Sequence, residues 1–174
     1  MTDAAAAMTI RMLGAGDADA LLALYRAVAA VPNAGLARTP DEMAPAYAES
    51  ILARAAAGGL SLGAFAEGAL VGEIHAFRPA PRQFAHVLSE LTVAVAPGWQ
   101  GRGVGRTLFA ALFDAAATLS PRVRRIELLA RSGNADAIRL YARLGFVIEG
   151  RLRARVRLAD GTVEDDIAMA RLLD

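Results

Sequence analysis

The segment from Glu90 to Arg106, ELTVAVAPGWQGRGVGR, constrains the fold more than any other part of the chain. A strand-like apolar run stops at Pro97-Gly98, and three glycines then alternate in Gln100-Gly101-Arg102-Gly103-Val104-Gly105 before a helical pattern begins. Glycines allow a tight turn and a close approach of a ligand to the backbone. A helix N-terminus adds free N–H groups and the positive end of its dipole. With Arg102 and Arg106, the segment predicts a cradle for a phosphate or diphosphate.

Other interpretations of this turn are weaker. A dinucleotide-binding turn needs a third glycine where Arg106 stands, and it usually lies in the first strand–helix unit of a chain. All 19 basic residues are arginine, so the chain has no lysine for a phosphate-binding loop or a Schiff base. A tight turn that binds nothing remains an alternative.

Apolar periodicity predicts the other elements. We expect strands at 8–13, 60–66, 70–77, 84–95, 124–130, 146–158 and 163–171, and helices at 18–30, 39–57, 103–118 and 134–144. Asp17 is the expected N-cap of the first helix, and Thr39 with Glu42 forms a capping box for the second. The order β α α β β β α β α β β predicts an α/β (α+β) fold with a mixed central sheet of about seven strands, flanked by about four helices.

Length and composition favour a single globular domain over residues 8–174, preceded by a disordered terminus at 1–7. The chain has 174 residues, of which 55% are apolar. It has no cysteine and two histidines, which excludes a disulfide framework, a thiol nucleophile and a cysteine-type metal site, so we expect no metal. Apolar runs reach six residues, whereas a membrane span needs about twenty. With no sign of a signal peptide, a cytoplasmic protein is the default expectation.

The charge is distributed unevenly along the chain. Residues 1–77 hold four arginines against eight acidic residues, whereas residues 78–174 hold fifteen against ten. The C-terminal half is therefore the expected place for an anionic ligand. The net charge of +1, without arginines clustered beside aromatic residues, gives little support for nucleic-acid binding.

Two segments together resemble the GCN5-related N-acetyltransferases. The acetyl-CoA signature [QR]-x-x-G-x-[GA] of that family is matched from Gln100 to Gly105. Its downstream signature, an asparagine followed by a helix with a tyrosine and then Gly-Phe, is matched by Asn134, Tyr141 and Gly145-Phe146. The resemblance extends from about residue 8 to 172, and the tail from Gly145 to Met169 is most similar to the amino-acid and phosphinothricin N-acetyltransferase branch.

The resemblance implies a site for acetyl-CoA. The N–H groups of Gln100, Gly101, Arg102, Gly103, Val104, Gly105 and Arg106 would hold the diphosphate. The pantetheine arm would pair with the backbone of Val93 and Val95, whose side chains are expected in the core. Asn134 would contact the cofactor, cap its own helix, or do both.

The resemblance also implies catalytic roles. Tyr141 would be the general acid that protonates the departing thiolate, although an ordinary core tyrosine is the alternative. Glu90 is the candidate base, acting directly or through water, in an apolar context where a carboxylate should be perturbed or paired. A structural ion pair is an equally good interpretation of Glu90. His75, His86 and Glu73 are the other candidate bases.

The acceptor site would involve the loop 31–38, the helix 39–57, the loop 78–84 and the last hairpin. Asn33, Arg38, Arg82 and Arg153 are its polar candidates. An arginine there would clamp a substrate carboxylate, or it would simply be solvated.

These inferences predict an N-acetyltransferase that moves an acetyl group from acetyl-CoA to a primary amine, on an amino acid, another small molecule or a protein N-terminus. Without cysteine, direct attack in a ternary complex is expected. The alternatives are a non-catalytic acyl-CoA sensor and, less favoured, an NAD(P)-binding domain. A homodimer is conceivable, because the final hairpin offers sheet edges that a second copy could cover.

Overall fold

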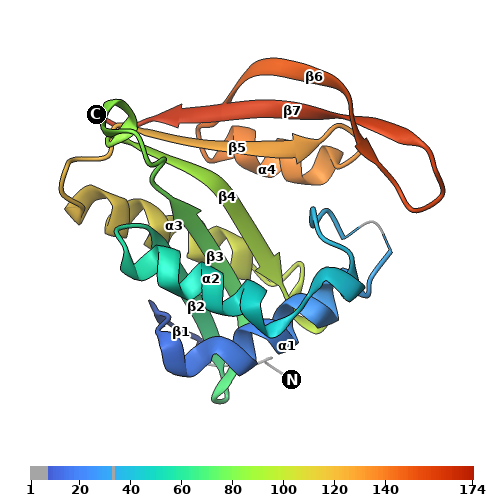
Figure 1. Cartoon of the computed structure of the whole chain (residues 1–174), viewed down its shortest axis with the longest axis horizontal. Coiled ribbons are helices and arrows are strands. Elements are labelled where there is room, and N and C mark those ends of the chain that lie inside the picture. The colour runs from blue at the N-terminus through green and yellow to red at the C-terminus, as the bar shows by residue number, and fades with distance from the viewer. Residues whose placement is uncertain (1–7, 33) are drawn as a thin grey trace, which may run out of the picture. The chain divides into compact units, whose positions relative to one another are not determined.

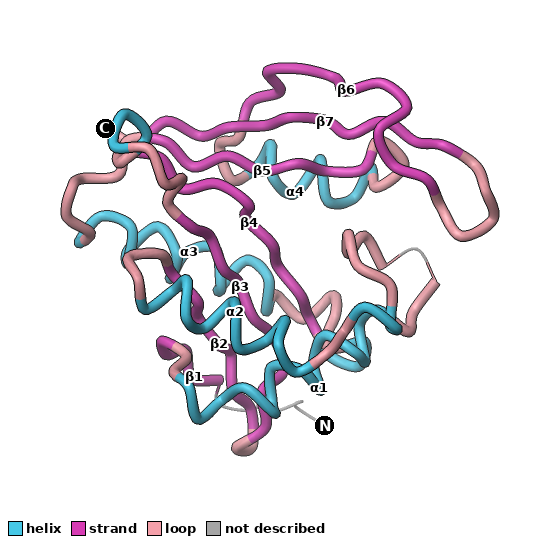
Figure 2. The backbone as a smooth tube through the Cα atoms, in the orientation of Figure 1, coloured by secondary structure: helices cyan, strands magenta, loops and turns pink. Residues whose placement is uncertain are grey.

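A computed structural model describes residues 8–32 and 34–174 (Figures 1 and 2). The predicted terminus 1–7 and the acceptor candidate Asn33 lie outside the described residues. The chain divides into two compact units with interleaved segments. The first contains the chain up to Phe77 and Thr92–Leu119, and the second contains Arg78–Leu91 and Ser120–Asp174. The single domain over 8–174 stays a prediction.

The elements follow the predicted order, which confirms the fold class. In chain order they are β1 (Met8–Met12), α1 (Ala18–Ala29), α2 (Pro45–Ala56), β2 (Leu60–Ala66), β3 (Ala69–Phe77), β4 (Val87–Val95), α3 (Val104–Thr118), β5 (Arg125–Arg131), α4 (Ala135–Arg143), β6 (Val147–Arg157) and β7 (Val163–Leu172). The seven strands are ordered β1-β2-β3-β4-β5-β7-β6. The β4–β5 pair is parallel, whereas β1–β2, β2–β3, β5–β7 and β6–β7 are antiparallel, so the sheet is mixed.

The first unit encloses an apolar core between the sheet and two helices. Leu21, Tyr25 and Val28 of α1 and Ile51 and Leu52 of α2 are almost fully buried in it. These positions recur at helical spacing, so each helix presents one apolar stripe to the sheet. Both helices pack against β3.

The third helix packs against β2 and β3 on the opposite face (Figure 1). A Cβ atom at Gly72 of β3 would lie 2.9 Å from Val104 Cγ1 and 3.1 Å from Leu108 Cδ1. The next residue, Glu73, contacts α1 instead, because successive side chains of a strand point to opposite faces. The missing side chain at Gly72 therefore lets the first turn of α3 rest directly on the sheet.

The second unit combines α4 with β5, β7 and β6. Ile126, Leu128, Ile167 and Met169 are buried, and α4 lies along one face of these strands (Figure 1). Arg171 of β7 donates from Nη1 to the carbonyl oxygen of Leu144, at 2.8 Å, just after α4. This bond ties the C-terminal end of α4 to the sheet of its own unit.

The predicted helix 39–57 is wrong at its start. Thr39 and Glu42 do form a capping box, but it caps a short 3-10 turn over Pro40–Glu42. Helix α2 begins afresh at Pro45, with Ala44 in an extended conformation (ψ 160°) as its N-cap. The residue before a proline is disfavoured in the helical region, so Pro45 separates the two elements.

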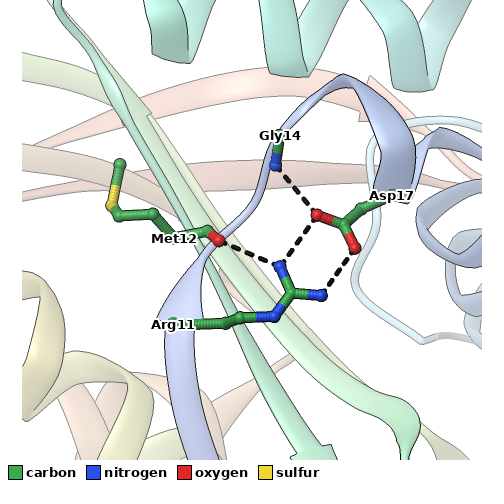
Figure 3. Close-up of polar contacts among 4 residues, drawn as sticks. All are labelled: Arg11, Met12, Gly14 and Asp17. Atoms are coloured by element: carbon green, nitrogen blue, oxygen red, sulfur yellow. Dashed lines mark hydrogen bonds and ion pairs between the residues drawn. The ribbon is translucent and has the colours of Figure 1, made fainter.

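Asp17 also behaves differently from its prediction. It occupies the N-cap position of α1 but makes no side-chain cap bond. Its carboxylate instead accepts from Arg11 Nη2 at 2.7 Å, from Arg11 Nη1 at 2.9 Å and from the Gly14 backbone N–H at 2.9 Å (Figure 3). A 3-10 turn over Ala15–Asp17 points the carboxylate back toward β1. The Arg11 guanidinium lowers the pKa of Asp17 to about 2.

We expect Asp17→Asn to lower the free energy of unfolding at pH 7 by about 0.2–1 kcal/mol, the range of exposed ion pairs. The folded-state pKa lies below the ordinary value of about 3.9, so this contribution is present above pH ~4 and is lost as the pH falls through about 2. Urea unfolding at pH 7, 4 and 2 measures it, with Asp19→Asn on the same helix as the control. An equal loss at pH 7 and pH 2 would contradict the ion-pair interpretation.

Candidate functional site

The turn between β4 and α3 has the backbone geometry that its glycines predict. A 3-10 turn over Pro97–Trp99 follows β4, and Gly101 (φ +74°) and Gly103 (φ +83°) then adopt left-handed conformations. Residues other than glycine rarely adopt such angles. A Cβ atom at either glycine would meet no heavy atom within 4 Å. The turn is therefore open on the side where those side chains would be.

The first turn of α3 directly follows this open turn and carries backbone donors. Gly103 is the N-cap, and Thr107 N–H closes onto the Gly103 carbonyl oxygen at 3.0 Å. The N–H groups that precede Thr107 in the helix have no carbonyl oxygen ahead of them to accept. A helix of 15 residues also places a positive dipole end here. Arg102 and Arg106 are exposed beside these donors. This arrangement suits an anion with several oxygens, such as a diphosphate.

The end of β4 is tied to the same turn. Gln100 Nε2 donates to the carbonyl oxygen of Val95 at 3.2 Å, so the side chain of the predicted motif residue fastens the turn to the strand. Val93 and Val95 are half-buried. Val95 Cγ2 lies 4.0 Å from the Cβ position of Gly105, which brings the strand end beside the first turn of α3. Residues 93–106 thus form one contiguous candidate site within the first unit.

The side chains of Trp99 and Arg102 meet at this turn, a contact that the sequence motifs do not predict. The Arg102 guanidinium carbon lies 5.2 Å from the centre of the Trp99 ring, a cation–π contact. Their spacing of three residues is the signal that could have suggested it.

The other predicted cofactor and catalytic residues belong to the second unit. Asn134 caps α4, its Oδ1 accepting from the Ala137 N–H at 3.1 Å, which confirms the capping interpretation. Tyr141 lies on α4 with its ring 6.1 Å from that of Phe146, in an edge arrangement. Burial raises the pKa of the Tyr141 hydroxyl above its usual value. The hydroxyl therefore stays protonated at neutral pH, as a proton donor must.

Glu90 has an unusual backbone conformation. It lies in β4 with a left-handed φ of +54°, two residues after the parallel register of β4 with β5 at Val87 and Leu88. This conformation interrupts the regular alternation of side chains along the strand. Ala94 is buried and Glu90 is exposed, so the expected apolar environment of the carboxylate is wrong. Strained residues of this kind concentrate at functional sites.

Two of the alternative bases are committed to a buried polar cluster. Glu73 is fully buried and accepts from Ser61 Oγ at 2.6 Å and from the Tyr25 hydroxyl at 2.8 Å. His75 Nδ1 lies 3.1 Å from Glu73 Oε2 and 3.2 Å from the Tyr25 oxygen. Burial and the Glu73 carboxylate raise the pKa of Tyr25 well above its usual value. These contacts fit a structural role for Glu73 and His75, whereas the third alternative, His86, is exposed.

The acceptor candidates are distributed over both units. Arg38, in the first unit, lies 4.7 Å over the ring of Tyr47 and 4.0 Å from a carboxylate oxygen of Glu42. Arg82 and Arg153, in the second unit, are exposed.

Within residues 8–32 and 34–174, no group of three or more histidine, cysteine, aspartate or glutamate side chains is arranged to hold a metal ion. No helix in the same ranges is both long enough and apolar enough to cross a bilayer.

Comparisons with known proteins agree on one family. The family model described as the acetyltransferase (GNAT) family matches residues 24–146, more than half of the chain. The chain therefore belongs to this family, whose general activity is acetyl-CoA-dependent acyl transfer. A search of curated proteins found no match.

Solved structures show the same fold. A GNAT acetyltransferase from Streptococcus pneumoniae is 23% identical with a TM-score of 0.87, covering 96% of this chain and 100% of its own. Ribosomal-protein-alanine N-acetyltransferase from Brucella melitensis is 28% identical with a TM-score of 0.81, covering 95% and 99%. The Salmonella typhimurium yncA protein, solved with its cofactor acetyl-CoA, is 24% identical with a TM-score of 0.79, covering 97% and 95%.

We expect Gly103→Val to abolish binding of acetyl-CoA. A β-branched residue is strained at φ +83°, and its side chain would project into the open side of the turn. Calorimetric titration measures the affinity, and thermal unfolding checks that the variant is folded.

Gly98→Val is the matched control. A Cβ at Gly98 also meets nothing within 4 Å, but Gly98 does not have a left-handed φ. Unchanged affinity in both variants would refute the assignment of the turn as a cofactor cradle.

Proposed function

We propose that the protein is an N-acetyltransferase that transfers the acetyl group of acetyl-CoA to a primary amine by direct attack in a ternary complex. The observation that carries the proposal is the open turn between β4 and α3, where two left-handed glycines and the first turn of a long helix present backbone donors beside two exposed arginines. Membership of the acetyltransferase (GNAT) family supports acetyl-CoA as the ligand of that turn.

The cofactor would be held by residues of the first unit. The N–H groups from Gln100 to Arg106 would bind the diphosphate, and the backbone of Val93 and Val95 would pair with the amide groups of the pantetheine arm. Asn134 of the second unit is a further proposed contact. Its Oδ1 already accepts one bond at the start of α4, so its amide nitrogen is the group we propose for the cofactor.

Two side chains are proposed to move protons. Glu90, directly or through a water molecule, would take a proton from the attacking amine as the N–C bond forms. Tyr141 would give its hydroxyl proton to the sulfur as the thioester C–S bond breaks. A thiol with a pKa near 8.5 is a suitable acceptor for a phenol proton in such a step. The chain has no cysteine, so an acetyl-cysteine intermediate is excluded.

The acceptor is proposed to be an amino-acid-like amine or a protein N-terminus. An α-amine has a pKa near 8, well below the 10.4 of a lysine side chain, and therefore demands less of the base. Arg38, Arg82 and Arg153 are the proposed partners of an acceptor carboxylate. The likeness to a ribosomal-protein-alanine N-acetyltransferase at 28% identity makes protein N-termini a class to include in the screen.

Three further proposals concern the domain organisation, the cellular location and the oligomeric state. We propose one N-acetyltransferase domain over residues 8–174 and a cytoplasmic location. We also propose a homodimer in which a second copy covers the edge strand β6. Val147, Leu152 and Val163 of the β6–β7 hairpin are exposed apolar side chains, which is consistent with such an interface.

Titration of acetyl-CoA into the purified protein by calorimetry tests the function, with NADH as the control ligand. Saturable binding of acetyl-CoA without an NADH signal is expected, followed by thiol release in a screen of amines. Binding without turnover on any amine would favour an acyl-CoA sensor. Absence of acetyl-CoA binding would refute the proposal.

We expect Tyr141→Phe to lower turnover by about 10²-fold or more, as loss of a general acid does. Affinity for acetyl-CoA should change little, because the phenyl ring still fills its place beside Phe146. Thiol release and calorimetry measure the two quantities.

Tyr25→Phe is the control, since it also removes a buried hydroxyl group. It should lower thermal stability by leaving Glu73 short of a donor, while turnover at a permissive temperature is retained. Equal turnover in Tyr141→Phe and wild type would remove Tyr141 from the mechanism.

A further inference from the structure

Trp99 is the only tryptophan of the chain, and it lies in the turn between β4 and α3, just before the cradle residues 100–106. It ends the 3-10 turn after β4, where its N–H donates to the Ala96 carbonyl oxygen at 2.8 Å. Trp99 is half-buried, so its ring is supported by the protein while part of it stays accessible. The guanidinium of Arg102 lies over this ring, 5.2 Å from its centre.

The side chain of Arg102 contacts an aromatic ring, whereas several other arginines of the chain pair with carboxylates. Arg11, Arg125, Arg151 and Arg155 pair with carboxylates. Within residues 8–32 and 34–174, Arg102 contacts the Trp99 ring and has no carboxylate partner. An aromatic ring holds a guanidinium without neutralising it. The positive charge of Arg102 thus stays uncompensated next to the donors of α3.

The Arg102 side chain lies against Trp99 across a turn that contains two left-handed glycines. Arg102 stands between Gly101 at φ +74° and Gly103 at φ +83°, and the contact of Arg102 with Trp99 reaches back across this turn. A long, flexible arginine side chain loses rotamer freedom when it binds a ligand. A side chain already resting on a ring has lost part of that freedom beforehand, which favours binding.

We propose that the Trp99 ring positions Arg102 to contact a phosphate group of the cofactor, so that Trp99 is a positioning residue of the cradle. A planar guanidinium can rest one face on an aromatic ring and still offer its N–H edge to phosphate oxygens. This inference rests on the proposed function, because it assumes that the turn binds acetyl-CoA.

A double-mutant cycle tests the proposal by calorimetry with acetyl-CoA. Arg102→Gln should weaken binding about 10-fold and reduce its dependence on salt, since a charge-assisted contact is lost. Trp99→Leu should weaken binding about 2- to 5-fold, and Trp99→Phe less, because a phenyl ring still offers an aromatic face. The double variant Trp99→Leu/Arg102→Gln should bind no more weakly than Arg102→Gln alone.

The controls separate this inference from the proposed function. Arg157→Gln removes one exposed charge from β6 and should leave the affinity unchanged. Arg102→Lys, which keeps the charge but not the planar group, should restore the salt dependence and only part of the affinity. In wild type, acetyl-CoA should change the Trp99 fluorescence, and in Arg102→Gln that change should be smaller.

Ligands that lack phosphates identify the contact. Dephospho-CoA lacks the 3′-phosphate. If Arg102→Gln no longer weakens the binding of this ligand, the 3′-phosphate is the partner of Arg102. If Arg102→Gln still weakens it, the diphosphate is the partner. Either result supports the proposal. An effect of equal size with S-acetylpantetheine would overturn it, as would additive losses in the cycle. Failure of wild type to bind acetyl-CoA would instead refute the proposed function.

Discussion

The carboxylate of Glu73 lies at zero exposure between the sheet and α1, and a buried carboxylate is tolerated only when donors surround it. Ser61 and Tyr25 supply two hydrogens. The Tyr25 hydroxyl gives its only hydrogen to Glu73, so His75 Nδ1 faces two acceptors and must itself carry a hydrogen. This cluster fixes α1 on β2 and β3. One residue earlier on β3, Gly72 admits α3 to the other face. Both helical layers of the first unit are thus set by adjacent residues of a single strand, and the position of the α3 N-terminus follows from it.

The backbone departs from regular strand geometry at Glu90 and in the cradle. Strand β4 is interrupted by the left-handed φ of Glu90, and the turn that follows needs left-handed conformations at Gly101 and Gly103. Beginning a helix directly after this turn leaves the N–H groups of the first helical turn without carbonyl partners. A chain that binds a polyanion through its backbone needs such a break, and Gln100 limits its cost by fastening the turn to Val95.

The features that sequence could predict are those that local chemistry decides. The glycine requirement of the turn is local, and so is the capping of α4 by Asn134, so both were predicted at the right residues. Pro45 shows a local signal that was overlooked, since it ends any helix continuing from Thr39. The Glu73 cluster could not be predicted in the same way, because Tyr25, Ser61 and His75 meet only once helix and strands have packed. Asp17 failed as a cap for a related reason: Arg11, across the turn from β1, offers a stronger partner than a helix N–H.

The distribution of charge along the sequence also predicts only part of the site. The arginine excess of residues 78–174 predicted an anionic ligand in that half, but much of the excess is committed within the fold. Arg125 pairs with Glu127 and Glu149, and Arg151 and Arg155 pair with Asp165 and Asp166. Paired arginines contribute little potential at a distance in salt. Arg102 and Arg106 differ, because in the described part of the chain neither has a carboxylate partner. Both also stand beside backbone N–H groups, whose partial charge is positive as well. What attracts an anion is therefore charge that the fold leaves uncompensated at one place, and net charge along the sequence is only an indirect measure of it.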